Sequence, residues 1–282
     1  MINKENLSDI ASEDIEIGLL LEAIYQKYGY DFRNYSREHI KRRVKHRLVL
    51  SNIDSISQMQ HRILYDNNFF YIVLRDFSIN VTEMFRDPSF YKAIREEVIP
   101  VLKTYPFIKI WHAGCSTGEE VYSMAILLKE EGLYDKAQIY ATDFNKNVLQ
   151  KAKEGIYPIE NIMKCQSNYS EAGGKHSFAD YYISKYDSVI FHKDLKEKII
   201  FADHNLVTDG VFGEMNMIIC RNVLIYFNKK LQNNVIKLFY DSLCYGGFLG
   251  LGSRESIKFT KCYDKYESYI TEENIFRKKF GD

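Results

Sequence analysis

The sequence has few of the residues that mark several large classes of protein. Its 282 residues include only four prolines and one tryptophan, and its five cysteines are an odd number with no CxxC spacing. The cysteines therefore predict neither a disulfide framework nor a zinc site, and we expect no metal. Free thiols of this kind favour a reduced, cytoplasmic compartment.

Excess charge and long apolar segments are lacking too. Lys and Arg total 38, as do Asp and Glu, so the formal net charge at pH 7 is zero. A balanced chain has no general attraction for nucleic acid or membranes, and a charge-driven contact must come from a local patch. No stretch approaches about 18 apolar residues, and the N-terminus lacks the regions of an export signal. We expect a soluble protein with no membrane insertion.

The pattern of apolar residues divides the chain. Residues 14–78 have helical periodicity and no proline, whereas strands and helices alternate from Ile108 onward. Such alternation is typical of a parallel sheet with crossover helices. We predict a helical domain over residues 1–79, a linker over 80–87 and an α/β domain over 88–282, with a small antiparallel β insert at about 156–198.

Periodicity and capping residues place the individual elements. Ser36 and Asp87 are predicted helix N-caps, and Gly155 a helix stop. Helices are predicted at 36–48, 56–64, 68–77, 88–102, 146–154 and 229–243, the last ended by Gly246 and Gly247. Strands are predicted at 138–143, 181–184, 188–192, 199–202, 217–220 and 248–252, with a closing hairpin of 266–270 and 275–280.

A turn of small residues, Gly114-Cys115-Ser116-Thr117-Gly118, follows the apolar strand that starts at Ile108. Small residues let a ligand approach the backbone, and the helix start that follows adds partial positive charge. Glu119 and Glu120 would repel a pyrophosphate, and a P-loop lysine is missing, so a cationic or hydroxyl-bearing ligand fits better. Simple tight packing is the alternative interpretation.

Asp143 ends the next predicted strand, 25 positions after Gly118. Doubly wound folds place a carboxylate for a ribose diol at about this spacing. The side chain is alternatively an ordinary cap for the helix that begins near Asn145. Together with the turn, Asp143 favours an adenosine-type ligand and leaves open whether that ligand carries a nicotinamide or a methyl sulfonium.

The helix that begins at Ser36 is strongly basic. Ile40, Val44 and Leu48 form one narrow apolar stripe, and cations occupy much of the remaining surface: Arg37, Lys41, Arg42, Arg43, Lys45 and Arg47. Such a helix is either a solvated face or a binding surface for RNA phosphates or an acidic protein. No aromatic residues are interleaved to stack bases, which disfavours nucleic acid.

The parallel sheet with a closing hairpin favours a methyltransferase over a nicotinamide dehydrogenase. After the apolar strand MIIC comes Arg221-Asn222-Val223-Leu224-Ile225-Tyr226-Phe227. This segment falls at the carboxyl edge of the sheet, where doubly wound folds bind ligands.

At this point the sequence resembles the CheR family of chemotaxis receptor methyltransferases. The matching segments, in the family's order and spacing, are NVTEMFRD, IWHAGCSTGEEVYSMA, ATDFNKNVLQKAKEGIY, Asn205-Leu206 and ICRNVLIYF. The resemblance runs from about Asp14 to the end. It implies a Rossmann-like class I methyltransferase fold that uses S-adenosylmethionine, releases S-adenosylhomocysteine and forms methyl esters on glutamates of methyl-accepting receptors.

The resemblance also implies roles for individual residues. Arg86 and Tyr226 match catalytic positions, and Arg42, Arg43 and Arg47 lie on the helix expected to face acidic receptor helices. The implied cofactor contacts are Asn80, Thr82, Arg86, Gly114, Glu120, Asp143, Asn205, Leu206, Asn222 and Val223. We expect a monomer with receptor helices as partners and no nucleic acid.

Some positions depart from the family pattern. Met84 replaces an aromatic residue often found there, and the turn Tyr186-Asp187-Ser188 is short where relatives that dock a receptor's C-terminal peptide have a glycine-containing loop. Tethered docking is therefore in doubt, although Gly173-Gly174 offers a displaced version of that loop. The main alternative function is a catalytically silent module that binds S-adenosylmethionine for signalling or as a scaffold. Methylation of RNA or a small acid is a weaker alternative.

Overall fold

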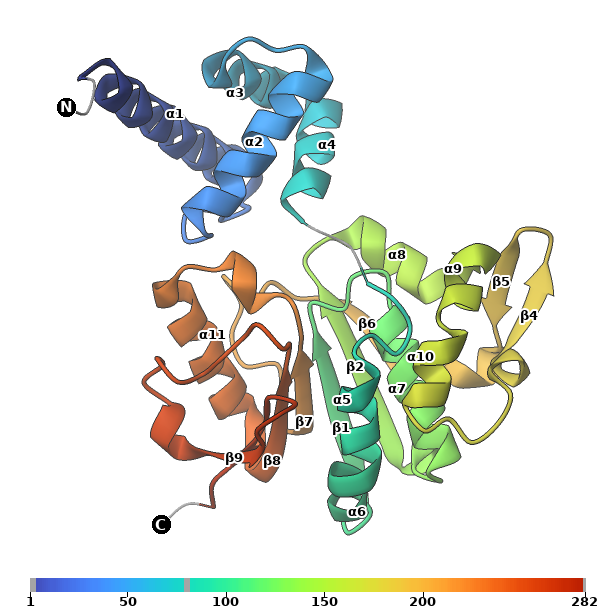
Figure 1. The fold of residues 1–282 in the computed structure, drawn as a ribbon. Helices are drawn as coiled ribbons and strands as arrows, with labels where there is room; N and C mark the ends of the chain where they lie inside the picture. Colours follow the sequence, from blue (N-terminus) through green and yellow to red (C-terminus); the bar gives the residue numbers. More distant parts are fainter. Residues whose placement is uncertain (1–3, 79–81, 281–282) are drawn as a thin grey trace. The chain divides into compact units, whose positions relative to one another are not determined.

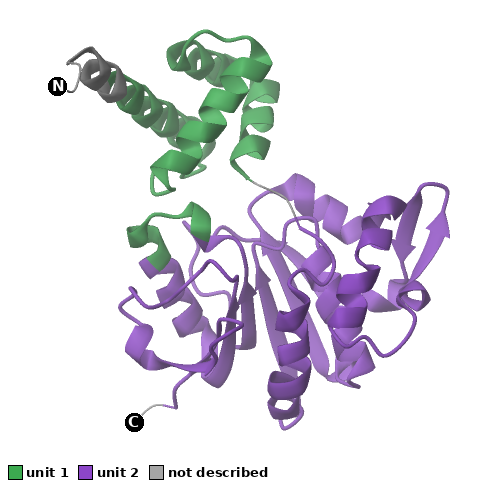
Figure 2. Cartoon of the chain, in the orientation of Figure 1, with its two compact units in different colours: residues 1–79, 225–232 green, residues 80–224, 233–282 purple. Residues whose placement is uncertain are grey.

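The computed structural model describes residues 4–78 and 82–280. The chain forms two compact units, coloured separately in Figure 2. One consists of Met1–Ile79 with Ile225–Gln232, which we call the helical unit; the other, the sheet unit, consists of Asn80–Leu224 with Asn233–Asp282. The short segment 225–232 thus groups with residues that lie more than a hundred positions earlier in the sequence.

Four helices build most of the helical unit: α1 (Lys4–Tyr28), α2 (Arg37–Ser51), α3 (Ile56–Tyr65) and α4 (Asn67–Phe77). Ile17, Leu20 and Ile24, which recur at helical spacing, form the buried face of α1, each at 0% exposure. Ser55 and Asp66 cap α3 and α4 through their side chains. Ser36 occupies the N-cap position of α2 as predicted, but its side chain makes no capping bond. Its backbone N–H instead donates to the carbonyl of Tyr226 at 2.7 Å.

The sheet unit contains a seven-stranded sheet in the order β6-β2-β1-β7-β8-β10-β9 (Figure 1). Neighbouring strands in the run β6-β2-β1-β7-β8 pair in parallel. Strand β10 pairs antiparallel with both β8 and β9. The bounds are β1 (Ile108–Ala113), β2 (Ala137–Asp143), β6 (Ile199–Asp203), β7 (Met215–Cys220), β8 (Leu243–Leu251), β9 (Tyr266–Ile270) and β10 (Ile275–Lys278). The predicted fold class, with its closing hairpin, is confirmed.

Helices flank this sheet: α5 (Pro88–Ala93), α6 (Ile99–Leu102), α7 (Glu119–Glu130), α8 (Lys146–Glu154) and α11 (Lys229–Ser242). A π-helical segment, η1 (Ile94–Val98), joins α5 to α6, so the helix predicted from Pro88 is one continuous run. Asp87 occupies its N-cap position but in a left-handed conformation and without a capping bond. Short 3-10 turns lie at η2 (Tyr134–Lys136), η3 (Phe178–Tyr181), η4 (Lys193–Leu195), η5 (Leu224–Tyr226) and η6 (Tyr263–Lys265).

One prediction about β8 is wrong. Gly246 and Gly247 do not end a helix, because α11 stops at Ser242 and β8 starts directly at Leu243. Both glycines lie inside the strand. Gly246 has a φ of 74°, and a Cβ on Gly247 would lie 2.9 Å from the Cys244 carbonyl oxygen, so the irregular start of β8 requires them.

The insert is a three-stranded antiparallel sheet with the order β3-β5-β4: β3 (Ile156–Pro158), β5 (Ser188–Phe191) and β4 (Tyr182–Lys185). It also carries two short helices that were not predicted, α9 (Ile159–Lys164) and α10 (Gln166–Glu171). Gly173 and Gly174 follow α10 and do not lie between β4 and β5. The turn joining those strands is therefore as short as the sequence indicates.

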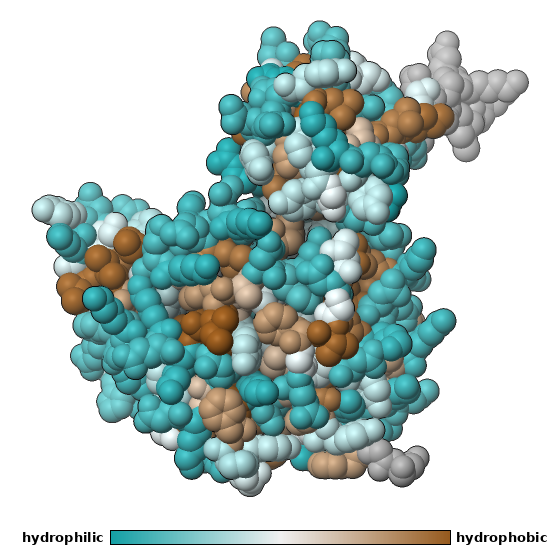
Figure 3. Space-filling view, turned by 180° about the vertical axis from the view of Figure 1, so that it is seen from behind, coloured by the Kyte–Doolittle hydropathy of each residue, from teal (hydrophilic) through white to brown (hydrophobic). Residues whose placement is uncertain are grey.

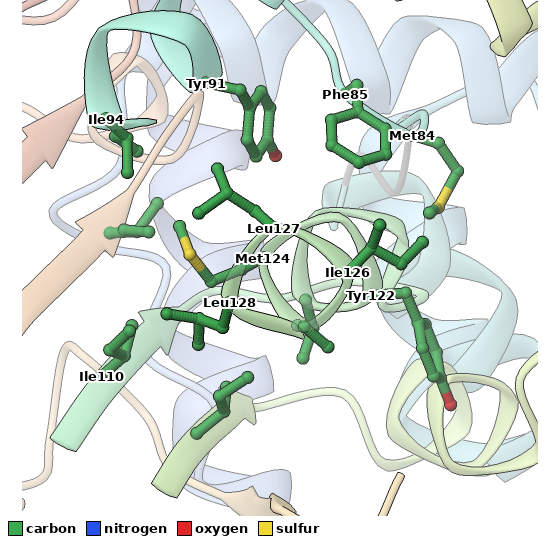
Figure 4. Close-up of a cluster of buried hydrophobic side chains, with 14 of the residues drawn as sticks. Met84, Phe85, Tyr91, Ile94, Ile110, Tyr122, Met124, Ile126, Leu127 and Leu128 are labelled. Atoms are coloured by element: carbon green, nitrogen blue, oxygen red, sulfur yellow. The ribbon is translucent and has the colours of Figure 1, made fainter. Parts of the chain in front are cut away.

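The core of the sheet unit forms around α7. Figure 4 shows Phe85 and Tyr91 on one side of this helix and Ile110 of β1 on another. All three side chains are fully buried and belong to one hydrophobic cluster. Phe85 is also held by its backbone N–H, which donates to Ser123 Oγ of α7 at 2.8 Å. The core therefore fixes the segment that carries Arg86, the residue after Phe85.

No helix among the described residues is long and apolar enough to cross a membrane. The face drawn in Figure 3 is mostly hydrophilic, and its hydrophobic residues form separate patches.

We predict that Ile110→Ala lowers the free energy of unfolding by about 2–5 kcal/mol, because it removes buried methyl groups and leaves a cavity in β1. Ile183→Ala is the matched control, since Ile183 is 58% exposed on β4, and should cost within about 0.5 kcal/mol. Denaturant unfolding followed by the fluorescence of Trp111, the one tryptophan of the chain, measures both. Equal losses in the two variants would contradict this description of the core.

Candidate functional site

The turn between β1 and α7 is built on left-handed backbone. Gly114 and Gly118 have φ values of 80° and 94°, and Ser116 has 52°. The N–H groups of Gly114 and Cys115 both donate to the carbonyl of Thr142, at 2.9 and 2.8 Å. A Cβ on Gly114 would lie only 2.7 Å from Val223 Cγ2. Glycine is thus required here, and two predicted cofactor residues, Gly114 and Val223, are brought into contact.

Asp143 lies at the carboxyl end of β2, beside this turn. Its two carboxylate oxygens accept backbone N–H groups from Ser116 at 3.0 Å and Asn145 at 2.9 Å. Asp143 is not the side-chain cap of α8, because Asn145 caps that helix by accepting from the N–H of Asn147. Burial, with a smaller effect of the Asp203 charge, raises the pKa of Asp143 to about 6 despite the opposing N–H donors.

Glu120 and Glu119 begin α7 and have different partners. Glu120 bonds to His112 Nδ1 at 3.0 Å and to Arg221 Nη1 at 3.2 Å. Burial would raise the pKa of Glu120, but these two partners outweigh it and lower the pKa. Glu119 accepts from the hydroxyl of Thr117 at 2.6 Å, and burial raises its pKa to about 7.

Arg221 is the centre of a buried charge network that the sequence analysis did not predict. Its side chain is 2% exposed and bonds to Glu120, to Asp87 Oδ2 at 2.5 Å and to the backbone carbonyl of Arg86 at 3.1 Å. Its guanidinium also lies 4.2 Å from the centre of the Phe90 ring. The sequence does contain one signal for this network: a charged residue directly follows the apolar strand MIIC. An arginine buried at such a position needs acidic partners.

The segment that carries the predicted interdomain contacts is partly described. Asn80 lies outside the described residues, so its prediction has no structural outcome. Thr82 and Arg86 are partly exposed in the sheet unit. Phe85 and Asp87, on either side of Arg86, both adopt positive φ values of 50° and 55°. This bend is held by the buried Phe85 ring and by the Asp87 ion pair with Arg221.

Asn205 and Leu206 follow β6 next to Asp143. The N–H of His204 reaches the carbonyl of Asp143 at 3.4 Å. The side chain of Asn205 accepts from the N–H of Val207 at 3.0 Å, and Asp209 accepts from the N–H of Asn205 at 2.8 Å. This local turn leaves Leu206 partly exposed beside the carboxyl edge.

Asn222 and Val223 follow β7, and a residue missed by the sequence analysis holds their backbone. The carboxylate of Glu255 accepts the N–H groups of Asn222 at 2.9 Å and Val223 at 2.8 Å. Asn222 itself has a φ of 62°. No sequence signal marks Glu255, because its partners on the loop after β7, Asn222 to Leu224, lie more than thirty residues away.

Tyr226 belongs to the helical unit, whereas Arg86 belongs to the sheet unit. Its ring lies 4.6 Å from the ring of His39 on α2, and its neighbour Phe227 pairs with Tyr35 in a single β-bridge. The two residues predicted as catalytic thus come from separate units.

The three arginines of α2 predicted to contact the receptor, Arg42, Arg43 and Arg47, differ in exposure and in ion pairing. Arg47 is engaged by Asp76 of α4 through two bonds of 2.5 and 2.8 Å, so it stabilises the helical unit. Arg42 is exposed and Arg43 is half-buried. Other cations of α2 pair with acids of α1, as Lys41 and Lys45 do with Glu13. The free positive charge of α2 is therefore smaller than its sequence indicates.

The carboxyl edge of β1, β2 and β7 fits a donor with a cation and a diol. Asp143 accepts backbone N–H groups from Ser116 and Asn145 and is also hydrogen-bonded to the backbone of Phe144, and its ionised carboxylate suits further hydroxyl donors such as those of a diol. At the start of α7, Glu120 is already paired with Arg221 and His112, and Glu119 adds a carboxyl group whose ionised form suits an ammonium or sulfonium and would repel a phosphate. Among the residues that the structure describes, no group of three or more His, Cys, Asp or Glu is placed to hold a metal ion.

We predict that affinity for S-adenosylhomocysteine falls as the pH drops from 7 to 5, by about tenfold per pH unit below the Asp143 pKa of about 6. Affinity falls with falling pH because the two ribose hydroxyls are expected to donate to the ionised Asp143 carboxylate, and protonation removes this ionised form. Titration calorimetry at several pH values measures it. Asp143→Asn should bind weakly without this dependence, whereas Glu119→Gln should keep it. An Asp143→Asn variant with the wild-type pH dependence would contradict the assignment.

Comparison with known proteins identifies the family of this chain. The family model described as "CheR methyltransferase, SAM binding domain" matches residues 80–271, and "CheR methyltransferase, all-alpha domain" matches residues 15–78. The chain is 52% identical to Cher3 of Pseudomonas putida over 265 residues, covering 94% of this chain and 97% of that one. It is 28% identical to a chemotaxis protein methyltransferase of Borreliella burgdorferi, covering 92% and 94% of the two chains.

A solved structure, the N-methyltransferase NodS from Bradyrhizobium japonicum with S-adenosyl-l-homocysteine, covers 60% of this chain and 62% of its own at 13% identity, with a TM-score of 0.34. That likeness is weak, whereas the family matches cover most of the chain. The chain belongs to the CheR methyltransferase family and contains the family's S-adenosylmethionine-binding domain.

Proposed function

We propose that this protein transfers a methyl group from S-adenosylmethionine to glutamate side chains of methyl-accepting chemotaxis receptors, in the cytoplasm. The observation that carries the proposal is the ion pair between the buried guanidinium of Arg221 and the partly exposed carboxylate of Asp87. It pins the segment bearing Arg86 beside the acidic turn at the start of α7. A guanidinium that can bind a carboxylate therefore accompanies a site whose acids suit a cationic donor.

Bound S-adenosylmethionine supplies an electrophilic methyl group on its sulfonium. A glutamate acceptor is already ionised at neutral pH, so one carboxylate oxygen forms the new bond to carbon as the carbon–sulfur bond breaks, and no general base is required. The protein's task is then alignment. Holding nucleophile and electrophile in attack geometry can contribute roughly 7–11 kcal/mol of barrier reduction.

The proposed roles come from the family resemblance, and contacts within the chain support several of them. Asp143 holds the ribose hydroxyls, and the Gly114 turn with Asn222 and Val223 forms the wall beside the methionine part. Arg86 orients the acceptor carboxylate, ideally through two parallel hydrogen bonds. Its backbone is fixed by Arg221, so only its side chain needs to move. Tyr226 is proposed as a second donor to the acceptor, on the family resemblance.

Arg86→Ala should lower methyl transfer by at least about a hundredfold, which corresponds to roughly 3 kcal/mol for a lost charged hydrogen bond. Affinity for S-adenosylhomocysteine and the unfolding midpoint should change little. Arg62→Ala, which removes a half-exposed arginine from α3, is the control and should transfer normally. Transfer of labelled methyl to an acidic receptor fragment is the assay, and release of the label by mild base identifies a carboxyl ester.

Two results would contradict the proposal. Full turnover in Arg86→Ala would remove Arg86 from the reaction. A wild-type protein that binds S-adenosylhomocysteine but labels no receptor fragment would favour a silent binding module.

The exposed part of α2 is proposed to contact the acidic receptor helices. Reversing the exposed Arg42 to glutamate should raise the apparent KM for the receptor by up to about fivefold, because an exposed pair is worth about 0.2–1 kcal/mol. The salt dependence of KM should flatten, with cofactor affinity unchanged. Arg47 is left intact because it pairs with Asp76.

Lys136→Glu provides the matched control for charge. Lys136 is exposed at the amino end of β2, at the opposite edge of the sheet from Asp143. An equal rise in KM in Lys136→Glu would show that only net charge matters and would remove α2 from the receptor surface.

A further inference from the structure

Glu255 lies in the loop after β8 and makes a set of contacts that no catalytic role explains. The residue is 5% exposed. Its Oε2 accepts the N–H groups of Gly252 at 2.7 Å and Asn222 at 2.9 Å, and its Oε1 accepts those of Val223 at 2.8 Å and Leu224 at 2.7 Å. Four donors match the roughly four lone-pair sites of a carboxylate. This carboxylate therefore has little capacity left for a ligand.

The three donors from Asn222 to Leu224 are consecutive, and Asn222 is in the left-handed region with a φ of 62°. Consecutive N–H groups in such a conformation form a concave anion site. Here the protein fills the concavity with its own carboxylate. Without that carboxylate, these partly or fully buried N–H groups would lose a hydrogen-bond acceptor, and the loop would be expected to rearrange.

The rearrangement would reach the cofactor site through Val223. Its Cγ2 lies where a Cβ on Gly114 would be only 2.7 Å away, so the loop after β7 packs directly on the turn between β1 and α7. Gly252 is fitted to the same contact from the other side, because a Cβ there would lie 2.9 Å from Glu255 Oε2. Through its bonds to the loop after β7, Glu255 thus influences how this loop packs on the turn between β1 and α7.

We propose that Glu255 is a positioning residue: it holds the backbone of residues 222–224 in the shape that binds S-adenosylmethionine, without touching the cofactor. The inference rests on the assignment of Asn222 and Val223 to the cofactor site, and it does not depend on which acceptor is methylated. Glu255 acts as an internal anion that preorganises the wall of the site.

The test compares Glu255→Gln with Glu130→Gln in the full chain. Glu130 is a matched control because its side chain is 1% exposed and heavily bonded, to Arg95, Tyr169 and Tyr181, at the far end of α7. Both variants should lose stability. Only Glu255→Gln should also weaken S-adenosylhomocysteine binding in titration calorimetry, by about tenfold to a hundredfold, because its amide nitrogen cannot accept the N–H groups.

Two further measurements separate positioning from general destabilisation. Hydrogen exchange followed by mass spectrometry should show faster exchange at residues 222–224 in Glu255→Gln and not in Glu130→Gln. In turnover assays, Glu255→Gln should raise the KM for S-adenosylmethionine while kcat at saturation stays near the wild-type value.

Glu255→Asp covers the case in which the glutamine variant does not fold, because it keeps the charge and withdraws the carboxylate by one methylene. It should weaken binding in the same direction, by less. Wild-type affinity in a folded Glu255 variant, or an equal loss in Glu130→Gln, would overturn the inference. Since the binding test contains no acceptor, absence of receptor methylation by the wild type would contradict the proposed function and leave this inference standing.

Discussion

The buried guanidinium of Arg221 joins three parts of the sheet unit that are far apart in the sequence. It lies at the end of β7, pairs with Glu120 at the start of α7, and bonds to Asp87 and the Arg86 carbonyl before α5. A charge this deeply buried is stable only with its partners in place, and removing one partner of such a pair typically costs about 3–5 kcal/mol. The network therefore couples the fold of the carboxyl edge to the placement of Arg86.

A second carboxylate organises the same edge by a different means. Arg221 acts mainly through its charge, on two carboxylates and the carbonyl of Arg86, whereas Glu255 fixes backbone through four N–H groups. The two act on adjacent residues, since Asn222 follows Arg221 directly. The loop after β7 is thus held from both sides, and Gly114 is the position at which it meets the opposite turn. These supports fix the backbone of the carboxyl edge on which Asp143 and Arg86 lie.

Local chemistry explains which features could be predicted from the sequence. Helix α8 was placed at its observed bounds because Asn145 precedes it and Gly155, with a φ of 60°, ends it. The strands of the parallel sheet were found because each is a short apolar run. The glycines of β8 misled the prediction, since glycine also serves irregular strands. Helices α9 and α10 were missed because each is only six residues long.

The site could be predicted only as far as its residues carry motifs. The turn and Asp143 were identified from spacing, and the residue roles came from the family resemblance. The partners of Arg221 and Glu255 could not be predicted from the sequence. The contact between Arg221 and Asp87, for example, spans 134 positions, and no local pattern encodes it. The pairing of Arg47 with Asp76 was hidden for the same reason, and it removes one cation from the predicted receptor surface.

A crystal structure of the protein with S-adenosylhomocysteine tests the account most directly. We expect the ligand at the carboxyl edge of β1, β2 and β7, with both ribose hydroxyls on Asp143 and with Arg221 still bonded to Glu120 and Asp87. A ligand bound away from Asp143, or a complex in which Arg221 has released the Arg86 segment, would contradict it.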